Sequence, residues 1–262
     1  MQDMKTLVYK NINIAYTDSG KGPAIVLLHG FLENLHMWKT LSPELIKTHR
    51  VIAIDLLGHG KTECLGYIHS MEDMADAVRA VLVHLKLRKY TFIGHSMGGY
   101  VALAYAEFFP DNLKGLVLLN STSKADSNER KQNRTRAIKA VKQNHKAFIS
   151  MSIANLFAEE NRAPLAKAIE HVKKEALKTP IQGIIAALEG MKARPDREAL
   201  LHFTPYKKMI VAGRKDPILD INDVRAQTVG TNVELVELAD GHMSHIENMK
   251  GLSYIVKRFI EK

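Results

Sequence analysis

The chain has 262 residues, a hydrophobic fraction of 46% and a formal net charge of +9, values that suit one globular domain with a single large core. Its one cysteine, Cys64, excludes an intramolecular disulfide and fits a reducing compartment. Residues 1–5 lack the basic segment and apolar core of a signal peptide, and no apolar run approaches the ~20 residues of a membrane span, so we expect a cytoplasmic protein.

Predicted strands and helices alternate along the first half of the chain. Residues 6–17 predict a strand hairpin. The apolar runs 24–28, 51–54 and 90–93 predict strands that are buried on both faces of a parallel sheet. Residues 71–86 predict a helix with one apolar stripe. This alternation is typical of βαβ units, so we expect an α/β fold with a mostly parallel central sheet.

One pentapeptide carries the strongest functional signal. Residues 94–98 read Gly-His-Ser-Met-Gly and lie between a strand-like run and a helix-like segment. Gly-x-Ser-x-Gly at a strand-to-helix turn is typical of a nucleophile elbow, whose strained serine presents its hydroxyl above the sheet. Side chains at Gly94 and Gly98 would collide with the neighbouring strand and helix. The pattern predicts Ser96 as a nucleophile and the backbone N–H of Met97, at a helix N-terminus, as an oxyanion donor.

A second oxyanion donor is expected in the loop after an earlier strand. The apolar run 24–28 ends in the tripeptide His-Gly-Phe. Gly30 allows the chain to turn close to a substrate. The backbone N–H of Phe31 is therefore the predicted second donor of an oxyanion hole.

A nucleophilic serine needs a general base, and the chain has 12 histidines. His242 follows the strand-like run 232–238, on a loop at the sheet edge where open α/β sheets bind ligands. We expect His245 to support this loop or to cap the next helix. His95 lies inside the elbow and is expected to point away from the serine, as a packing residue. We predict His242 as the base.

A carboxylate must orient that base. Asp216 lies just past a predicted strand and before a helix, at the same edge of the sheet. Asp240 is a poorer candidate, because it is two residues from His242 and would have to fold back to reach the imidazole. Asn120 ends the strand after the elbow helix and cannot supply a carboxylate. The predicted triad is Ser96, Asp216 and His242.

These motifs resemble those of the α/β-hydrolase family, of the esterase and lipase type, and the resemblance covers nearly the whole chain. Residues 55–62 are similar to the family's D-x-x-G-x-G-x-S turn, with Thr62 in place of the serine. We expect Asp55 to anchor this loop and not to act as a catalyst. Residues 241–247 resemble the family's terminal GHxxHxE pattern, in which the first histidine is catalytic.

The resemblance implies an α/β-hydrolase core, formed by residues 1–120 and 201–262, with a helical cap inserted at 121–200. Three helical patterns occupy the cap segment, and Thr179-Pro180 reads as the N-cap and first residue of the third. We expect the cap to cover the serine and to supply most of an acyl pocket, although most of its apolar stripes should serve packing.

The cap segment carries most of the positive charge. Residues 121–200 contain 16 Lys and Arg against 9 Asp and Glu, and eight of these cations fall between Lys124 and Lys146. They form either a positive rim that attracts anionic substrates, with Arg134, Arg136 and Lys139 at the entrance, or a solvated helix face, which we favour. Nucleic-acid binding is not expected, because no recognition motif accompanies the charge. No zinc-binding spacing or phosphate loop is present, so neither a metal nor a cofactor is expected.

The sequence therefore predicts a carboxylesterase-like serine hydrolase that acts on a small-molecule ester through an acyl-enzyme. Dehalogenases and epoxide hydrolases of this fold are disfavoured, because their nucleophile is aspartate. The family's synthase of menaquinone biosynthesis and its carbon–carbon hydrolases are less favoured, because Tyr100 replaces an arginine and His95 replaces an asparagine. A lactonase, a cofactor-free perhydrolase and a small-molecule receptor that retains the triad stay open, as does the oligomeric state.

Overall fold

The computed structural model describes residues 3–262; residues 1–2, which begin the segment inspected for a signal peptide, lie outside it. Its strands are β1 (Met4–Tyr9), β2 (Ile12–Ser19), β3 (Ala24–Leu28), β4 (Arg50–Ile54), β5 (Tyr90–His95), β6 (Leu113–Leu119), β7 (Lys207–Gly213) and β8 (Glu234–Leu238). They form one sheet in the order β1-β2-β4-β3-β5-β6-β7-β8. The β1–β2 and β2–β4 pairs are antiparallel and the others are parallel, which confirms the mostly parallel sheet.

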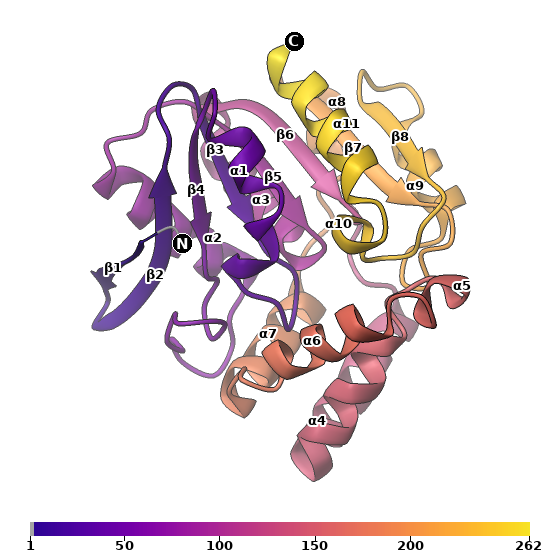
Figure 1. Ribbon diagram of the computed structural model, residues 1–262. Coiled ribbons are helices and arrows are strands. Elements are labelled where there is room, and N and C mark those ends of the chain that lie inside the picture. Colours follow the sequence, from indigo (N-terminus) through magenta and orange to yellow (C-terminus); the bar gives the residue numbers. More distant parts are fainter. Residues whose placement is uncertain (1–2) are drawn as a thin grey trace.

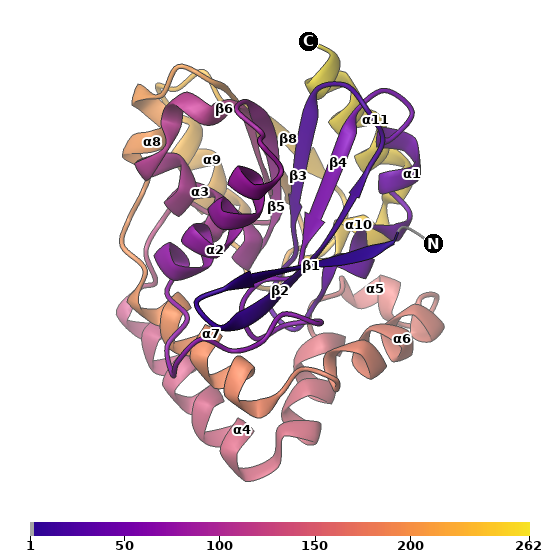
Figure 2. The same ribbon diagram turned by 90° about the vertical axis from the view of Figure 1, so that its left-hand side faces the viewer.

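Helices cover both faces of this sheet (Figures 1 and 2). The helices of the core are α1 (Ser42–Leu45), α2 (Met71–His84), α3 (Met97–Phe108), α9 (Ile221–Thr228), α10 (Ser244–Glu247) and α11 (Met249–Glu261), with short 3-10 helices at Leu35–Lys39 and Pro110–Asn112. Along β3, Val26 and Leu28 join the core that packs under α2 and α3, whereas Ile25 and Leu27 join the core under α1 and α11. This strand is buried on both faces, as its continuous apolar run predicts.

The helical cap lies between β6 and β7 in the sequence. Its helices are α4 (Asn128–Ala154), α5 (Glu159–Arg162), α6 (Ala166–Ala176) and α7 (Ile181–Ala193), and α8 (Ala199–Phe203) leads back to β7. Helices α4 to α7 gather at one end of the sheet in both views (Figures 1 and 2). Asn144 kinks α4 with non-helical backbone angles.

The third cap helix begins one residue later than predicted. Pro180 has an extended ψ of 144° and serves as the N-cap, so the first helical residue is Ile181.

None of the helices within residues 3–262 combines the length and the apolarity that crossing a bilayer requires.

Candidate active site

The nucleophile elbow has the strained geometry that its sequence predicts. Ser96 joins β5 to α3 with φ 48° and ψ −113°, a conformation that side-chain-bearing residues rarely adopt. A Cβ at Gly94 would lie 2.4 Å from the carbonyl oxygen of Gly98, and one at Gly98 would lie 2.3 Å from that of Leu28. Both positions therefore require glycine. The Ser96 N–H donates to the carbonyl of Leu119 at 2.9 Å and fixes the turn against β6.

The structure brings the three predicted triad residues into one chain of hydrogen bonds. The Nε2 atom of His242 lies 2.9 Å from Ser96 Oγ, and its Nδ1 atom lies 2.7 Å from Asp216 Oδ2. Because the carboxylate can only accept, Nδ1 carries the proton and Nε2 is free to accept the serine hydroxyl proton. The His242 and Asp216 side chains are only 3% and 1% exposed, so little water competes for these bonds.

Asp216 is held as a carboxylate by its neighbours. Its Oδ1 atom accepts the backbone N–H groups of Ile218 and Leu219 at 2.8 and 3.0 Å. Burial alone would raise the pKa of Asp216, but His242 and these hydrogen bonds hold the pKa below its usual value. The group therefore remains ionised at neutral pH.

Asn120 has a role that the sequence did not indicate. Its Nδ2 atom donates to Asp216 Oδ2 at 3.2 Å and to the Gly241 carbonyl at 3.1 Å, so it connects the acid to the histidine loop. Asp240, the alternative acid, makes no hydrogen bond to His242, and burial raises its pKa. The geometry favours Asp216 over Asp240, as predicted.

The two predicted oxyanion donors belong to residues next to the nucleophile in the chain or in the cavity. Met97 is the first residue of α3, so its N–H has no acceptor within the helix. Phe31 follows β3 and lines the same cavity as Ser96. The loop before Phe31 is held in place because the Gly30 N–H donates to Glu33 Oε2 at 2.8 Å.

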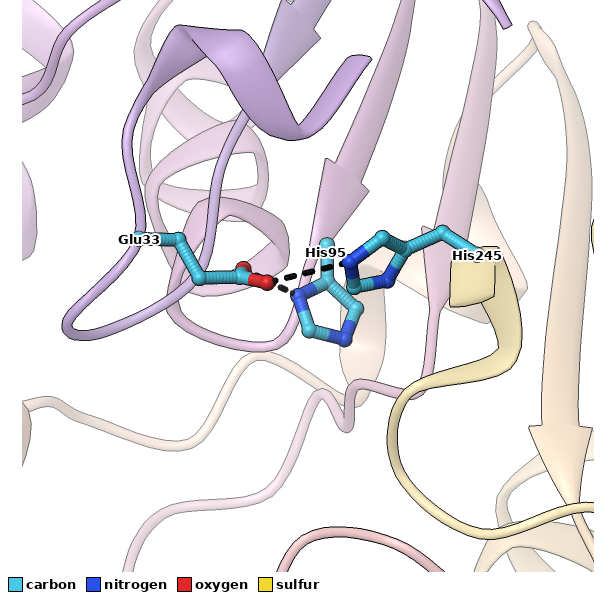
Figure 3. Close-up of side chains that lie close together, drawn as sticks. All are labelled: Glu33, His95 and His245. Atoms are coloured by element: carbon cyan, nitrogen blue, oxygen red, sulfur yellow. Dashed lines mark hydrogen bonds and ion pairs between the residues drawn. The ribbon is translucent and has the colours of Figure 1, made fainter. Parts of the chain in front are cut away.

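Glu33 is a buried acidic residue of the site that sequence reasoning missed. Figure 3 shows its carboxylate facing the rings of both His95 and His245. Its Oε2 atom lies 2.7 Å from His95 Nδ1, and its Oε1 atom lies 3.3 Å from His245 Nε2. The only available signal was an acidic residue three positions after the His-Gly turn.

His95 is a buried cation. Its Nδ1 atom faces Glu33 and its Nε2 atom lies 2.9 Å from the backbone carbonyl of His242. Both partners are acceptors, so both ring nitrogens must carry protons. Burial lowers the pKa of His95, but the Glu33 charge outweighs this effect and raises it above its usual value. His95 thus packs behind the triad, as expected, and also positions the main chain of the base.

Glu33, His95 and His245 also have the spacing of metal ligands, with their donor atoms within 4.8 Å of one another. Binding a metal would require removing the proton that His95 Nδ1 donates to Glu33. Burial lowers the pKa of His245, so this ring is neutral and donates its Nε2 proton to Glu33. Glu33 thus pairs with both rings, and only His245 Nδ1 of this group has no hydrogen-bond partner among the described residues. We interpret the three residues as an internal ion-pair network.

Two further acidic residues fix loops around the site. Asp55 accepts the N–H groups of Leu35 and Lys61 at 2.7 and 2.8 Å, which confirms that it anchors its loop. Glu247, the last residue of the GHxxHxE pattern, accepts the N–H of Gly241 at 3.2 Å. It also accepts the N–H of Ala158 in the cap at 3.0 Å. Glu247 therefore ties the loop that carries the base to the cap.

A cavity of about 450 Å³ opens above Ser96 and His242. Cap residues supply most of its lining, and several come from the apolar stripes that the sequence assigned mainly to packing: Phe148, Ile153, Leu156, Leu188 and Met191. Of the cap cations, Arg130 and Arg134 line this cavity, whereas Arg136 and Lys139 line a separate surface hollow. The alternative in which Arg134, Arg136 and Lys139 together form a positive rim is not supported, because Arg134 lines this cavity whereas Arg136 and Lys139 line the other hollow.

The chain belongs to the α/β-hydrolase fold family, whose model matches residues 23–249. A thermophilic esterase from Thermogutta terrifontis, whose structure has malate bound, is 30% identical with a TM-score of 0.91, and the match covers 100% of this chain and 98% of that one. A putative 2-succinyl-6-hydroxy-2,4-cyclohexadiene-1-carboxylate synthase from Bacillus subtilis is 28% identical over 94% of this chain and 95% of its own. The dihydrolipoyllysine-residue acetyltransferase component of the acetoin cleaving system of Pseudomonas putida is 28% identical over 92% of this chain, which spans only 64% of that protein.

Proposed function

We propose that the protein is a serine hydrolase that cleaves carboxylic esters through an acyl-enzyme. The observation that carries this proposal is the 2.9 Å contact between Ser96 Oγ and His242 Nε2, made on a strained elbow at the base of a cavity. The similarity to the Thermogutta esterase over the whole chain supports the same chemistry.

In the proposed first half-reaction, Ser96 Oγ attacks the ester carbonyl carbon while its proton passes to His242 Nε2. The carbonyl electron pair moves onto the oxygen, which the N–H groups of Met97 and Phe31 stabilise. When the tetrahedral intermediate collapses, the carbon–oxygen bond to the alcohol breaks. His242 then returns its proton to the departing alkoxide, while Asp216 stabilises the imidazolium.

The second half-reaction repeats these steps with water. His242 Nε2 accepts a water proton as the water oxygen attacks the acyl carbon, and the Ser96–acyl bond breaks as the serine recovers its proton. Each residue thus returns to its starting protonation state. The acid is released as a carboxylate.

A panel of 4-nitrophenyl esters of graded acyl length, with several lactones, tests this proposal. We expect repeated turnover of esters, covalent labelling of Ser96 by a fluorophosphonate, and a loss of about 10³-fold or more in rate for Ser96→Ala. Labelling of any other serine, or activity that survives Ser96→Ala, would overturn the mechanism. Turnover of lactones alone would identify a lactonase. A single slow turnover with retained product would identify a receptor.

A further inference from the structure

Three arginines of the cap surround one buried carboxylate. Asp126, whose side chain is 0% exposed, forms ion pairs with Arg130 at 3.2 Å, with Arg194 at 2.8 Å and with Arg134. Burial would raise the pKa of Asp126, but the three guanidinium groups hold the pKa below its usual value. The carboxylate is therefore ionised and balances one of the three cations. Two positive charges remain without a partner charge in the cluster.

Arg194 serves the structure of the cap. Its side chain is 3% exposed, its guanidinium donates to the carbonyls of Met191 and Lys124, and it lies 3.9 Å from the ring centroid of Tyr100. Its hydrogen-bonding capacity is directed into the protein. The unbalanced charge is consequently presented by the other two arginines.

Arg130 and Arg134 line the cavity that contains Ser96 and His242. Their side chains are 33% and 15% exposed, so neither is fully buried as Asp126 is. Arg130 Nη1 also donates to the carbonyl of Ile218 at 2.9 Å, in the loop that supplies the triad acid. The two cations therefore lie on the wall of the cavity next to the candidate triad.

The cluster has the organisation of an anion-binding site. Among residues 3–262, Arg130 Nη2 and Arg134 Nη1 have no hydrogen-bond acceptor, while their remaining donors bind Asp126 or the main chain. Asp126 lies behind them and holds the guanidinium groups in position before any ligand arrives. Glu33, the one carboxylate among the described residues that line the cavity, is already paired with protonated His95.

We propose that Arg130 and Arg134 bind a carboxylate of the substrate, so that the preferred substrates are monoesters of aliphatic dicarboxylic acids. Arg130 Nη2 and Arg134 Nη1 can each donate a charge-assisted hydrogen bond to a carboxylate, and the apolar remainder of the cavity suits the methylene chain between the two ends. The inference rests on the proposed ester hydrolysis and names its substrate class.

The test compares pairs of substrates that differ only in charge. Monoethyl esters of the dicarboxylic acids from succinate to pimelate are measured beside the ethyl ester amides of the same length, in which a neutral amide replaces the carboxylate. We expect kcat/KM to favour the carboxylate by about tenfold or more at the best chain length, equivalent to about 1.4 kcal/mol. This preference should decrease as salt rises, because screening weakens exposed charges.

Variants assign the preference to the two arginines. Arg130→Gln and Arg134→Gln should each reduce the carboxylate-to-amide ratio of kcat/KM by about fivefold or more, because a charge-assisted bond is lost. Arg136→Gln and Lys139→Gln remove equal charge from the same helix but line a different hollow, so they should leave the ratio and the turnover of the amide unchanged. Equal losses in all four variants would indicate a general field and would overturn the inference.

Binding to the Ser96→Ala protein separates this inference from the proposed function, because binding requires no turnover. Calorimetry should show tighter binding of the monoethyl ester than of its amide, and Arg134→Gln should remove the difference. Discrimination in binding without hydrolysis by the wild type would overturn the proposed function and support the carboxylate site. Hydrolysis of both substrates with equal kcat/KM, and equal binding, would overturn the carboxylate site alone.

Discussion

Asp216→Asn is a specific test of the triad. It replaces a carboxylate oxygen, which accepts hydrogen bonds, with an NH₂ group, which donates them, and it leaves the shape of the side chain almost unchanged. Asp216 Oδ1 accepts two backbone N–H groups, and Oδ2 accepts from His242 Nδ1 and Asn120 Nδ2. If the amide oxygen keeps the backbone bonds, the new NH₂ group faces two donors. His242 can then bond only with its proton on Nε2, and a ring in that tautomer cannot take the proton of Ser96.

The opposite orientation of the amide does not restore the site. It would place the NH₂ group against the N–H groups of Ile218 and Leu219, and each lost bond to a buried group costs about 1–3 kcal/mol. The wrong tautomer is therefore the favoured state of the variant. We expect kcat to fall by about 10⁴-fold, the loss that this exchange causes in serine triads. At about 1.36 kcal/mol for each factor of ten, the barrier rises by about 5.4 kcal/mol.

Steady-state hydrolysis of the best 4-nitrophenyl ester measures this loss, and near-UV circular dichroism checks that the fold is intact. Asp240→Asn is the matched control, since Asp240 lies near the same loop but makes no hydrogen bond to His242; its kcat should change by less than about tenfold. The assignment of the acid is refuted if Asp216→Asn loses less activity than Asp240→Asn.

Two further predictions concern the ion pair behind the triad. Glu33→Gln should lower the free energy of unfolding by about 3–5 kcal/mol, measured by urea denaturation, because His95 loses its buried counter-charge; a change below about 1 kcal/mol would contradict this role. Because the folded-state pKa of His95 is raised above 6.5, the stability that its protonation contributes is complete below that pH and is lost as pH rises through the folded-state pKa. The difference in unfolding free energy between wild type and His95→Asn should therefore shrink above about pH 7, and a constant difference from about pH 6 to 9 would exclude a buried imidazolium.

Most of the sheet and the elbow can be predicted from the sequence. Each apolar run specifies one strand, and the glycines of the elbow specify one turn, without reference to distant residues. A Cβ at Gly94 or Gly98 meets main-chain atoms, so the motif alone specifies the turn around Ser96. The positions of His242 and Asp216 could also be predicted, since each follows a parallel strand, and the carboxyl ends of these strands meet at one edge.

Glu33 and the division of the cap cations could not be predicted in this way. Glu33 contacts His95, which is 62 residues away in sequence, and His245, which lies still further along the chain, and no local pattern records contacts of that kind. Likewise, Arg134 and Arg136 are close in sequence, but they line different hollows. Positions two residues apart on a helix face different directions.

The alternation of strands and helices, the elbow and the chain order of the predicted triad follow from the sequence, because each depends on residues close together in the chain. Which buried charges are paired and which remain open to the cavity follows from the packing of distant segments. That distinction depends on the burial of Asp126 and Glu33 and on which cations form ion pairs with them. Burial strengthens such electrostatic interactions, and burial is a property of the packed molecule.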